Sequence, residues 1–555
     1  MPQLPWRLLL LDVDGTLVDS RKRLLPEVRL AVRQAVASGL PVTLATGRMS
    51  SAVLPWAREL GVRTPLICNN GADLVDPATG DCLRKLTLDP AAARQALAFG
   101  RDAGVSIALF SGPRVFVPER TPDHWLIERN YETVTVRPFP ELIAAPPPSE
   151  KLLFLDQAHP ERLPPLRDAL LRHAGAAEFL AEITEPGILN ICHPASGKLA
   201  ALRELARRLG LAPGELAVIG DSDNDAGMIR YAGLGIAMAN ATPPTLAAAR
   251  FVTAAGDEAG LVPAICDRLL RREFAPDAPG SLATTLRELR LRIRAAGSAV
   301  VAFSGGSDSS LVLRLAAEEL PPEKLLAVTA TSAVFPEADR QAAAALAAEL
   351  AVTWQLLDME ATNRQRWYGA NPENRCYLCK HAFYGKLAAI ARERQLAAVL
   401  DGENADDLRS HRPGRRAAVE HGIRSPLAES GLAKADVRAL GRELGLPQWD
   451  RPANACLATR FPHGTPLTPA ALAQVARAEA VLAEAGFRSV RVRVVEGTAR
   501  VEVAQPQVPL AQARIGELER RLMACGFARV EVDPRGYRPG AMAERAVPGQ
   551  AAGAA

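Results

Sequence analysis

The sequence has few of the features that mark secreted, membrane or disulfide-stabilised proteins. Its 555 residues include only eight cysteines, and their spacing does not form a disulfide framework. No run of about 18 uncharged apolar residues occurs, so no transmembrane helix and no membrane partner are expected. The first apolar run, residues 7–13, is short and ends among carboxylates, unlike a secretory leader. We therefore expect a cytoplasmic protein with reduced cysteines.

The chain also has little excess of either positive or negative charge. The formal net charge is +4, from 66 basic and 62 acidic residues, and aromatic residues account for 5%. Nucleic-acid-binding modules usually concentrate basic and aromatic side chains, so no nucleic-acid partner is expected. The apolar content of 48% and the charged content of 23% are typical of a soluble globular protein.

The length and the pattern of apolar runs predict several α/β domains. A chain of 555 residues is too long for one ordinary core. Strand-like apolar runs alternate with Ala/Leu/Arg-rich helical runs, which favours an α/β fold. Proline and glycine residues predict a linker at 273–284. We expect a first domain at 1–272, a second at 285–540, and a disordered tail at 541–555.

Carboxylates gather at the ends of three expected strands in the first domain. Because ligand sites of open α/β sheets lie at the carboxyl ends of the strands, these motifs should meet. One carboxylate can attack phosphorus while another moves a proton, and oxygen-only ligands favour Mg²⁺. The motifs are Asp12-Val13-Asp14-Gly15-Thr16, Thr46-Gly47-Arg48 and Gly220-Asp221-Ser222-Asp223-Asn224-Asp225.

In this order the three motifs resemble the Cof-type haloacid dehalogenase-like (HAD) phosphatases, over about residues 5–270. The resemblance implies a Rossmannoid core at 1–80 and 190–272, with an inserted α/β cap at about 81–189 that selects the substrate. It also implies a role for each motif residue. Asp12 would be the nucleophile, Asp14 the general acid/base, Thr46 and Lys198 the groups that hold and neutralise the phosphoryl group, and Asp12, Asp14, Asp221 and Asp225 the Mg²⁺ ligands.

The second domain contains a small-residue loop between an expected strand, 299–303, and an expected helix, 311–315. The loop is Ser304-Gly305-Gly306-Ser307-Asp308-Ser309. Its backbone N–H groups can close around an anion at the positive end of the helix, although the lysine of a Walker loop is missing. It resembles the SGGxDS loop of the PP-loop ATP pyrophosphatases. The resemblance implies that Ser304, Gly305, Gly306, Ser307 and Ser309 bind the pyrophosphate of ATP, and that Asp308 helps to hold Mg²⁺.

Three further clusters and a closing motif extend this resemblance to the LarE family of ATP-dependent sulfur transferases, over about residues 285–540. The clusters are 371–380 with Cys376 and Cys379, 401–407 followed by Arg412-Pro413-Gly414, and 451–462 with Cys456, and the closing motif is 535–540. The resemblance implies a PP-loop α/β domain with a small C-terminal α+β subdomain.

The LarE resemblance also implies a reaction. ATP adenylates a ring carboxylate of pyridinium-3,5-dicarboxylate mononucleotide, and a sulfur nucleophile then displaces AMP to leave a thiocarboxylate. This is a step toward the nickel-pincer nucleotide cofactor. A carboxylate is a poor electrophile until its oxygen becomes a good leaving group, so the use of ATP is chemically sensible. A sulfur donor protein and a homo-oligomer are the partners that the resemblance implies.

The cysteines decide the source of the sulfur. Cys376, Cys379 and Cys456 resemble the LarE subgroup that holds a [4Fe–4S] cluster by three cysteines, with the fourth iron open for a sulfide. Three thiolates suit an iron–sulfur site, but they equally suit zinc with a ligand from elsewhere. In single-cysteine members the cysteine corresponding to Cys456 gives up its own sulfur, and this alternative also stays open.

Two arginines alternate with valines in a strand-like segment. Arg491 and Arg493 should therefore point to one face of the strand, as either an exposed edge or an anion-binding face. The family's R-V-R motif at this place implies that they bind the substrate phosphate.

Two other functions compete with a phosphatase joined to a sulfur transferase. One is tRNA thiolation, or another ATP-dependent adenylating or amidating reaction, which shares the loop and the C-x-x-C pair. The weak net charge argues against an RNA substrate. The other makes the first domain a non-catalytic module that only binds a phosphorylated ligand, but all of its catalytic positions are present.

Overall fold

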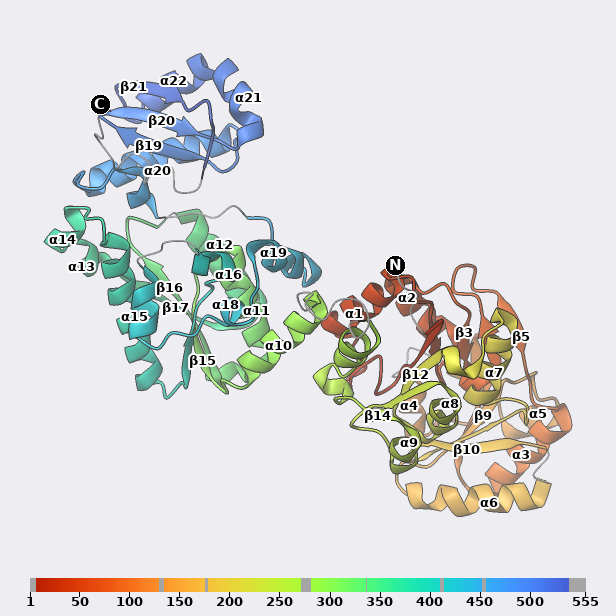
Figure 1. Cartoon of the computed structure of the whole chain (residues 1–555). Coiled ribbons are helices and arrows are strands. Elements are labelled where there is room, and N and C mark those ends of the chain that lie inside the picture. The colour runs from red at the N-terminus through yellow and green to blue at the C-terminus, as the bar shows by residue number, and fades with distance from the viewer. Residues whose placement is uncertain are drawn as a thin grey trace, which may run out of the picture. The chain divides into compact units, whose positions relative to one another are not determined.

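The computed structural model describes residues 6–128, 134–174, 178–270, 281–335, 337–409, 414–451 and 456–538. The chain divides into two compact units, Met1–Arg287 and Glu288–Ala555, and each is described by itself (Figure 1). Helix α10 (Leu282–Arg294) begins before the predicted linker ends at residue 284. The rest of that linker, apart from 281, and the expected tail at 541–555 lie outside the described residues.

The first unit is built on an eight-stranded sheet. Its order is β14-β13-β12-β1-β2-β3-β4-β5, and the pairs from β14 to β3 are parallel. The strands are β1 (Leu8–Asp12), β2 (Val42–Ala45), β3 (Leu66–Cys68), β4 (Asp73–Val75), β5 (Cys82–Lys85), β12 (Leu216–Gly220), β13 (Leu234–Ala237) and β14 (Phe251–Val252).

Helices cover both faces of this sheet, which explains why β1 is a continuous apolar run. Leu9 and Leu11 pack in one buried core, and Leu8 and Leu10 in the other. The helices of this domain are α1 (Pro26–Ala37), α2 (Ser50–Leu60), α7 (Lys198–Leu209), α8 (Ala226–Tyr231), α9 (Pro243–Ala248) and a π-helix (Pro263–Leu270).

A second sheet forms the cap, in the order β10-β11-β9-β6-β7-β8. The predicted cap boundaries shift: β5 belongs to the core sheet, and the cap sheet continues to Cys192. Helices α3, α5 and α6 pack on one face of it (Figure 1). The cap elements are α3 (Pro90–Ala103), β6 (Ser106–Ser111), β7 (Arg114–Val117), α4 (Trp125–Glu128), β8 (Val134–Val136), α5 (Phe139–Ala144), β9 (Lys151–Leu155), α6 (Leu163–Ala174), β10 (Leu180–Glu185) and β11 (Ile188–Cys192).

The second unit contains a parallel four-stranded sheet in the order β17-β16-β15-β18. Its strands are β15 (Ala299–Ala302), β16 (Leu325–Thr331), β17 (Thr353–Asp358) and β18 (Ala398–Leu400). Besides α10, its helices are α11 (Ser307–Glu319), α12 (Glu337–Glu349), α13 (Glu360–Asn363), α14 (Arg366–Gly369), α15 (Arg375–Glu393), α16 (Ala405–Arg409), α17 (Gly414–Glu420), α18 (Pro426–Glu429) and α19 (Lys434–Glu443).

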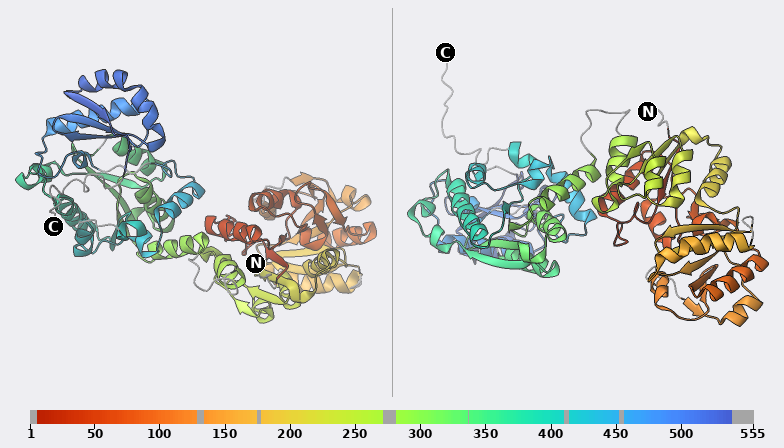
Figure 2. Two further views of the ribbon diagram at one scale, coloured as in Figure 1. Left: turned by 45° about the horizontal axis from the view of Figure 1, so that its top comes forward. Right: turned by 90° about the horizontal axis from the view of Figure 1, so that it is seen from below.

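A small α+β subdomain closes the second unit, blue in Figure 2. It has a three-stranded sheet, β19-β20-β21, and its own buried core. Its elements are α20 (Pro469–Glu484), β19 (Arg491–Val495), β20 (Thr498–Glu502), α21 (Val508–Ala513), α22 (Ile515–Met523) and β21 (Arg529–Val532). The predicted fold class, two α/β domains with an inserted cap and a small α+β subdomain, is confirmed.

Candidate active sites

Three carboxylates meet at one edge of the core sheet. Strand β1 lies between β12 and β2, and parallel pairing brings their carboxyl ends together. Ligand oxygens of Asp12, Asp221 and Asp225 all lie within 4.8 Å of one another, and among the described residues no other trio of His, Cys, Asp or Glu does so. The sequence therefore predicted this convergence correctly for these three residues.

Lys198 reaches into this cluster from the first turn of α7. Its Nζ lies 2.6 Å from Asp12 Oδ1 and 2.7 Å from Asp225 Oδ1. Burial disfavours the ammonium form, but the two carboxylates outweigh burial and raise the pKa of Lys198. The backbone that carries Lys198 packs closely on Gly71, where a Cβ would lie 2.3 Å from the Gly197 carbonyl oxygen.

The cluster holds more negative than positive charge. Three buried or half-buried carboxylates face one ammonium, and Oδ2 of Asp12 is buried without a hydrogen-bond partner. Burial and then the charge of Asp225 raise the pKa of Asp12, and the same two causes raise the pKa of Asp221 to about 6. An oxygen-only, electron-rich donor set with an orphaned oxygen fits a Mg²⁺ ion.

Asp14 was predicted as a fourth Mg²⁺ ligand, but its carboxylate is not part of the cluster that Asp12, Asp221 and Asp225 form. Arg48 donates to both of its carboxylate oxygens, at 2.9 and 2.6 Å, and Lys22 Nζ lies 2.7 Å from Oδ1. Burial favours the protonated acid, yet Arg48 and Lys22 hold the pKa of Asp14 well below its usual range. Thr46 is buried nearby, and its hydroxyl accepts a hydrogen bond from the Arg48 backbone N–H at 3.1 Å. A cavity of about 280 Å³ joins Asp12, Asp14 and Lys198 to the cap.

The raised pKa of Asp221 gives a stability prediction. An acid whose pKa is higher in the folded state, here about 6, binds protons more readily when folded, so its contribution to stability is lost as the pH rises through 6. At pH 7.5 without Mg²⁺, Asp221 is ionised and is repelled by the charge of Asp225. Asp221→Asn removes this repulsion and should raise the Tm of its unit by a few degrees. Calorimetry with EDTA and with Mg²⁺ measures this Tm. The Tm of the wild type should rise when Mg²⁺ is added, and the variant should lose this rise. Asp223→Asn, exposed in the same loop, is the matched control, and equal shifts in both variants would contradict the argument.

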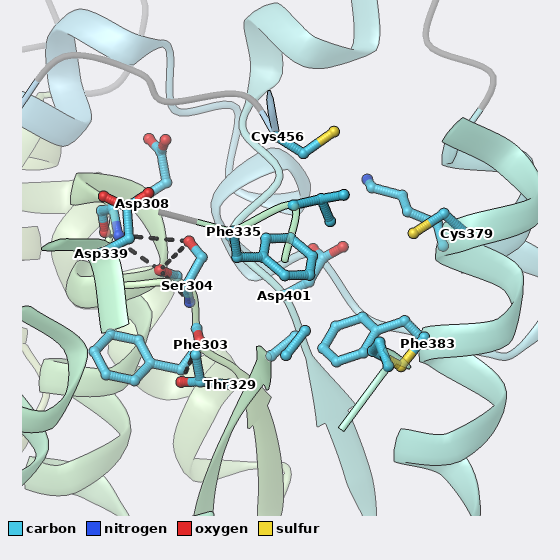
Figure 3. A pocket seen from close by; sticks show the side chains of 18 of the residues that line it. Phe303, Ser304, Asp308, Thr329, Phe335, Asp339, Cys379, Phe383, Asp401 and Cys456 are labelled. Atoms are coloured by element: carbon cyan, nitrogen blue, oxygen red, sulfur yellow. Dashed lines mark hydrogen bonds between the residues drawn. The ribbon is translucent and has the colours of Figure 1, made fainter. Parts of the chain in front are cut away.

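The second unit carries a larger cavity, of about 530 Å³, lined by the small-residue loop and all three predicted thiols (Figure 3). The loop follows β15 and leads into α11, which begins at Ser307 rather than at the predicted residue 311. Gly305 has a φ of +75°, which favours glycine. Ser309 Oγ accepts a hydrogen bond from the Ser304 N–H at 3.2 Å, so the loop is closed on itself.

Two cations that were not predicted as site residues contact the loop, although Arg451 is the first residue of the 451–462 cluster. Lys434, at the start of α19, donates to Ser307 Oγ at 2.8 Å and forms an ion pair with Asp308. Arg451 donates to the Gly305 carbonyl at 3.3 Å and pairs with Asp339 at 2.6 Å. A lysine from 126 residues further along the chain thus stands beside a loop that has none of its own.

Cys379 and Cys456 lie on the side of the cavity away from Ser304 (Figure 3), and Cys376 lines the same cavity. Burial raises the pKa of Cys456, and it raises the pKa of Cys379 to about 12, so both are protonated without a metal. The sulfurs of Cys376, Cys379 and Cys456 are not all within 4.8 Å of one another. Binding of zinc would require the three sulfurs to draw together, and both zinc and an iron–sulfur cluster stay predictions.

The segment after β18 backs directly onto the loop. A Cβ on Gly402 would lie 2.7 Å from the Ser309 backbone nitrogen. Asp401 accepts hydrogen bonds from Tyr384 at 2.8 Å and Ser425 at 2.7 Å. Glu403 lines the cavity with a buried, unpartnered Oε1. The sequence identified this segment as a motif. It gave no signal that Asp401 would accept two side-chain hydrogen bonds while Glu403 Oε1 has no partner.

The predicted phosphate-binding arginines lie in the small subdomain. Arg491 and Arg493 are buried on β19, at 5% and 6% exposure, and neither lines the cavity described above. Arg493 pairs with Glu502 at 3.2 Å and donates to the Thr459 carbonyl at 2.8 Å, which connects it to the segment that follows Cys456. The exposed-edge alternative is therefore wrong, and phosphate binding by this pair stays a prediction.

Comparison with known proteins agrees with this division. The haloacid dehalogenase-like hydrolase family model matches residues 9–265, and the NAD synthase family model matches residues 282–390. Pyridinium-3,5-bisthiocarboxylic acid mononucleotide synthase of Lactiplantibacillus plantarum is 38% identical over 269 residues, covering 47% of this chain and 95% of that protein. This chain is a fusion of a Cof-type HAD hydrolase with a LarE-family PP-loop protein.

Two further relatives each match about half of the length of the fusion. An uncharacterized protein of Synechocystis is 38% identical over 261 residues, covering 47% of the fusion and 97% of that protein. Putative phosphatase YxeH of Bacillus subtilis is 28% identical over 272 residues, covering 48% of the fusion and all of that protein. Within the described part of the fusion, no helix is both long and apolar enough to cross a membrane.

Proposed function

We propose that the chain is a bifunctional enzyme. The unit at about 1–272 hydrolyses a small phosphomonoester with Mg²⁺, and the unit at about 285–540 uses ATP to convert pyridinium-3,5-dicarboxylate mononucleotide into its thiocarboxylate for nickel-pincer nucleotide synthesis. The observation that carries the second activity is a single cavity that contains both an ATP-type loop and three thiols. The first activity rests on the carboxylate cluster with its buried lysine.

In the hydrolase unit, Asp12 is proposed as the nucleophile. Its buried Oδ2 has no partner, so a lone pair is available to attack phosphorus and form an aspartyl-phosphate. Lys198 stays protonated beside it and would neutralise the transferred phosphoryl group, which Thr46 helps to hold. Asp12, Asp221 and Asp225 would hold Mg²⁺, which would supply further charge neutralisation at the phosphoryl oxygens.

Asp14 is proposed as the general acid and base. Arg48 and Lys22 keep it ionised in the ligand-free site, which suits a base that takes a proton from water. To protonate a leaving group it must first bind a proton, and this requires weaker contact with the two cations. An incoming phosphate dianion competes for those same cations, because Arg48 and Lys22 line the cavity together with Asp14.

In the LarE-family unit, the residues fall into two groups across the cavity. The loop Ser304–Ser309 would bind the pyrophosphate part of ATP, with Lys434 and Arg451 neutralising it and Asp308 released to hold Mg²⁺. Attack of the substrate carboxylate on the α-phosphorus breaks the bond to pyrophosphate. A sulfur nucleophile then forms the C–S bond while the bond to AMP breaks. A [4Fe–4S] cluster on Cys376, Cys379 and Cys456 would supply a bound sulfide as this nucleophile.

Lys434→Ala tests this assignment of ATP contacts. Loss of a charged hydrogen bond to phosphate should raise the apparent Kd for ATP about 10-fold to 100-fold, since such bonds contribute about 1.5–3 kcal/mol. Equilibrium binding of ATP in the presence of Mg²⁺ measures this value. Lys324→Ala, an exposed lysine on the same unit, is the control. An unchanged ATP affinity in Lys434→Ala would rule out a direct phosphate contact.

The proposed overall reaction is tested by incubating the anaerobically purified protein with ATP, Mg²⁺, the pyridinium dicarboxylate mononucleotide, sodium sulfide as the sulfur source and an ammonium salt as the competing nucleophile. We expect AMP, pyrophosphate and a thiocarboxylate product in equal amounts, detected by mass spectrometry. Formation of AMP and pyrophosphate with an amide instead of a thiocarboxylate would place the unit among amidating PP-loop enzymes.

A further inference from the structure

One face of the cap sheet is apolar although it roofs a cavity that holds many charges. Along β9 the side chains alternate, as the period of a strand requires. Leu152 and Phe154 pack into the cap's own helical core. Lys151, Leu153 and Leu155 point the other way and line the 280 Å³ cavity above the carboxylate cluster.

Neighbouring elements continue this apolar surface. Strand β6 contributes Phe110, strand β11 contributes Ile188, and helix α4 contributes two more side chains. Together with the two leucines of β9 they form what we call the apolar roof: Phe110, Leu126, Ile127, Leu153, Leu155 and Ile188. The polar cap residues along the same cavity are Lys151, Thr184 and Glu185.

Lys151 marks the end of the roof nearest the core. Its Nζ donates to the Gly47 carbonyl at 2.5 Å and lies 4.0 Å from the centre of the Phe110 ring. Gly47 belongs to the motif that carries Thr46 and Arg48, so this contact ties the cap to the phosphoryl end of the cavity. The charged end and the apolar roof are therefore two parts of one cavity, as the two parts of a phosphomonoester require.

The composition of the roof discriminates between leaving groups. Where they face the leucine and isoleucine side chains, hydroxyl groups of a sugar or glycerol would lose water without gaining hydrogen bonds, and Lys151, Thr184 and Glu185 are the cap residues that could bind them. An apolar ring would instead displace water from surfaces that gain by its removal. Phe110, Ile127, Leu153 and Leu155 are buried in the cap, whereas Leu126 and Ile188 are only partly buried, so these two supply most of the surface available for such contact.

We propose that the hydrolase unit prefers phosphomonoesters whose leaving group presents an apolar, ring-sized surface, and discriminates against polyhydroxylated leaving groups. This inference deepens the proposed phosphatase activity and rests on it. The apolar roof is the specificity-determining surface, and the carboxylate cluster with Lys198 acts on the phosphoryl group of either class of ester.

The test compares benzyl phosphate with glycerol 3-phosphate. Both are esters of primary alcohols, so their intrinsic reactivity is similar and a difference in kcat/KM reports on the leaving group. We expect benzyl phosphate to be preferred by about tenfold or more. Ile188→Thr, which keeps the branch at Cβ but replaces the ethyl arm by a hydroxyl, should reduce this preference about threefold to tenfold. Val136→Thr, on an exposed cap strand outside the cavity, should leave it unchanged.

Binding of phosphonate analogues separates failure of the inference from failure of the phosphatase activity. Calorimetry with Mg²⁺ compares 2-phenylethylphosphonate with 3,4-dihydroxybutylphosphonate, which replace the ester oxygen by carbon. Tighter binding of the phenyl compound, weakened by Ile188→Thr, supports the roof even if no ester is hydrolysed. Equal or tighter binding of the dihydroxy compound, or a preference for glycerol 3-phosphate in turnover, overturns it.

Discussion

Asp12→Asn should abolish phosphatase turnover, by on the order of 10⁴-fold or more, and leave ATP-dependent sulfur transfer at its wild-type rate. The amide nitrogen of Asn cannot attack phosphorus, and the substitution also removes one oxygen from the carboxylate cluster and one partner of Lys198. Release of inorganic phosphate from benzyl phosphate and glycerol 3-phosphate measures the loss.

The second activity of the same chain controls for the amount and integrity of Asp12→Asn, and the calorimetric Tm of the hydrolase unit is its folding control, because the two activities belong to separate compact units. Asp168→Asn, an exposed carboxylate on α6, should have no effect on either activity. Retention of most phosphatase turnover by Asp12→Asn would support the alternative in which the hydrolase unit only binds a phosphorylated ligand.

Cys456→Ala should eliminate thiocarboxylate formation while pyrophosphate release with substrate persists. Cys456 lies on the thiol side of the cavity, whereas the ATP loop, with Lys434 and Arg451, lies across from it and is intact in the variant. Adenylation therefore continues until the activated carboxylate accumulates or is hydrolysed. Separate assays of pyrophosphate and of thiocarboxylate detect this split, and Cys525→Ala, in the small subdomain, should change neither.

Iron analysis of the same pair distinguishes the two sulfur sources. If a cluster delivers sulfur, the wild-type protein purified without oxygen contains about four iron atoms and acid-labile sulfide, and Cys456→Ala loses most of both. If Cys456 is consumed instead, no iron is found, and one reaction cycle removes its sulfur and leaves dehydroalanine. Full sulfur transfer by Cys456→Ala would contradict both routes.

The sequence predicted those parts of each site that come from strand ends and from contiguous motifs. Asp12, Asp221 and Asp225 follow three strands that pair in parallel, so topology alone brings them together. The loop at 304–309 is local, since a strand, a turn of small residues and a helix suffice to form it. Lys198 was predicted from its place in a motif, and its contacts agree.

Other contacts could not be predicted, because they depend on distant segments that carry no local signal. Lys434 is a lone lysine at a helix start, and only the folded chain brings it to Ser307 and Asp308. The alternation at Arg491 and Arg493 correctly gave one strand face, but not that this face would be buried against Glu502 and Thr459. The observed cap boundaries differ from the predicted ones because β5 pairs in the core sheet and β11 pairs in the cap sheet. The residues of a strand do not by themselves determine which strand it pairs with.

The contact between Gly402 and the ATP loop constrains how this protein can change by mutation. Any side chain at 402 would have to displace the backbone at Ser309, where a Cβ would come within 2.7 Å. A side chain at position 402 would therefore disturb both the 304–309 loop and the acidic segment that begins at Asp401. Substitutions that adapt this cavity to a different acceptor are therefore expected at lining side chains such as Phe335 and Phe383, and not at this contact between two backbone segments.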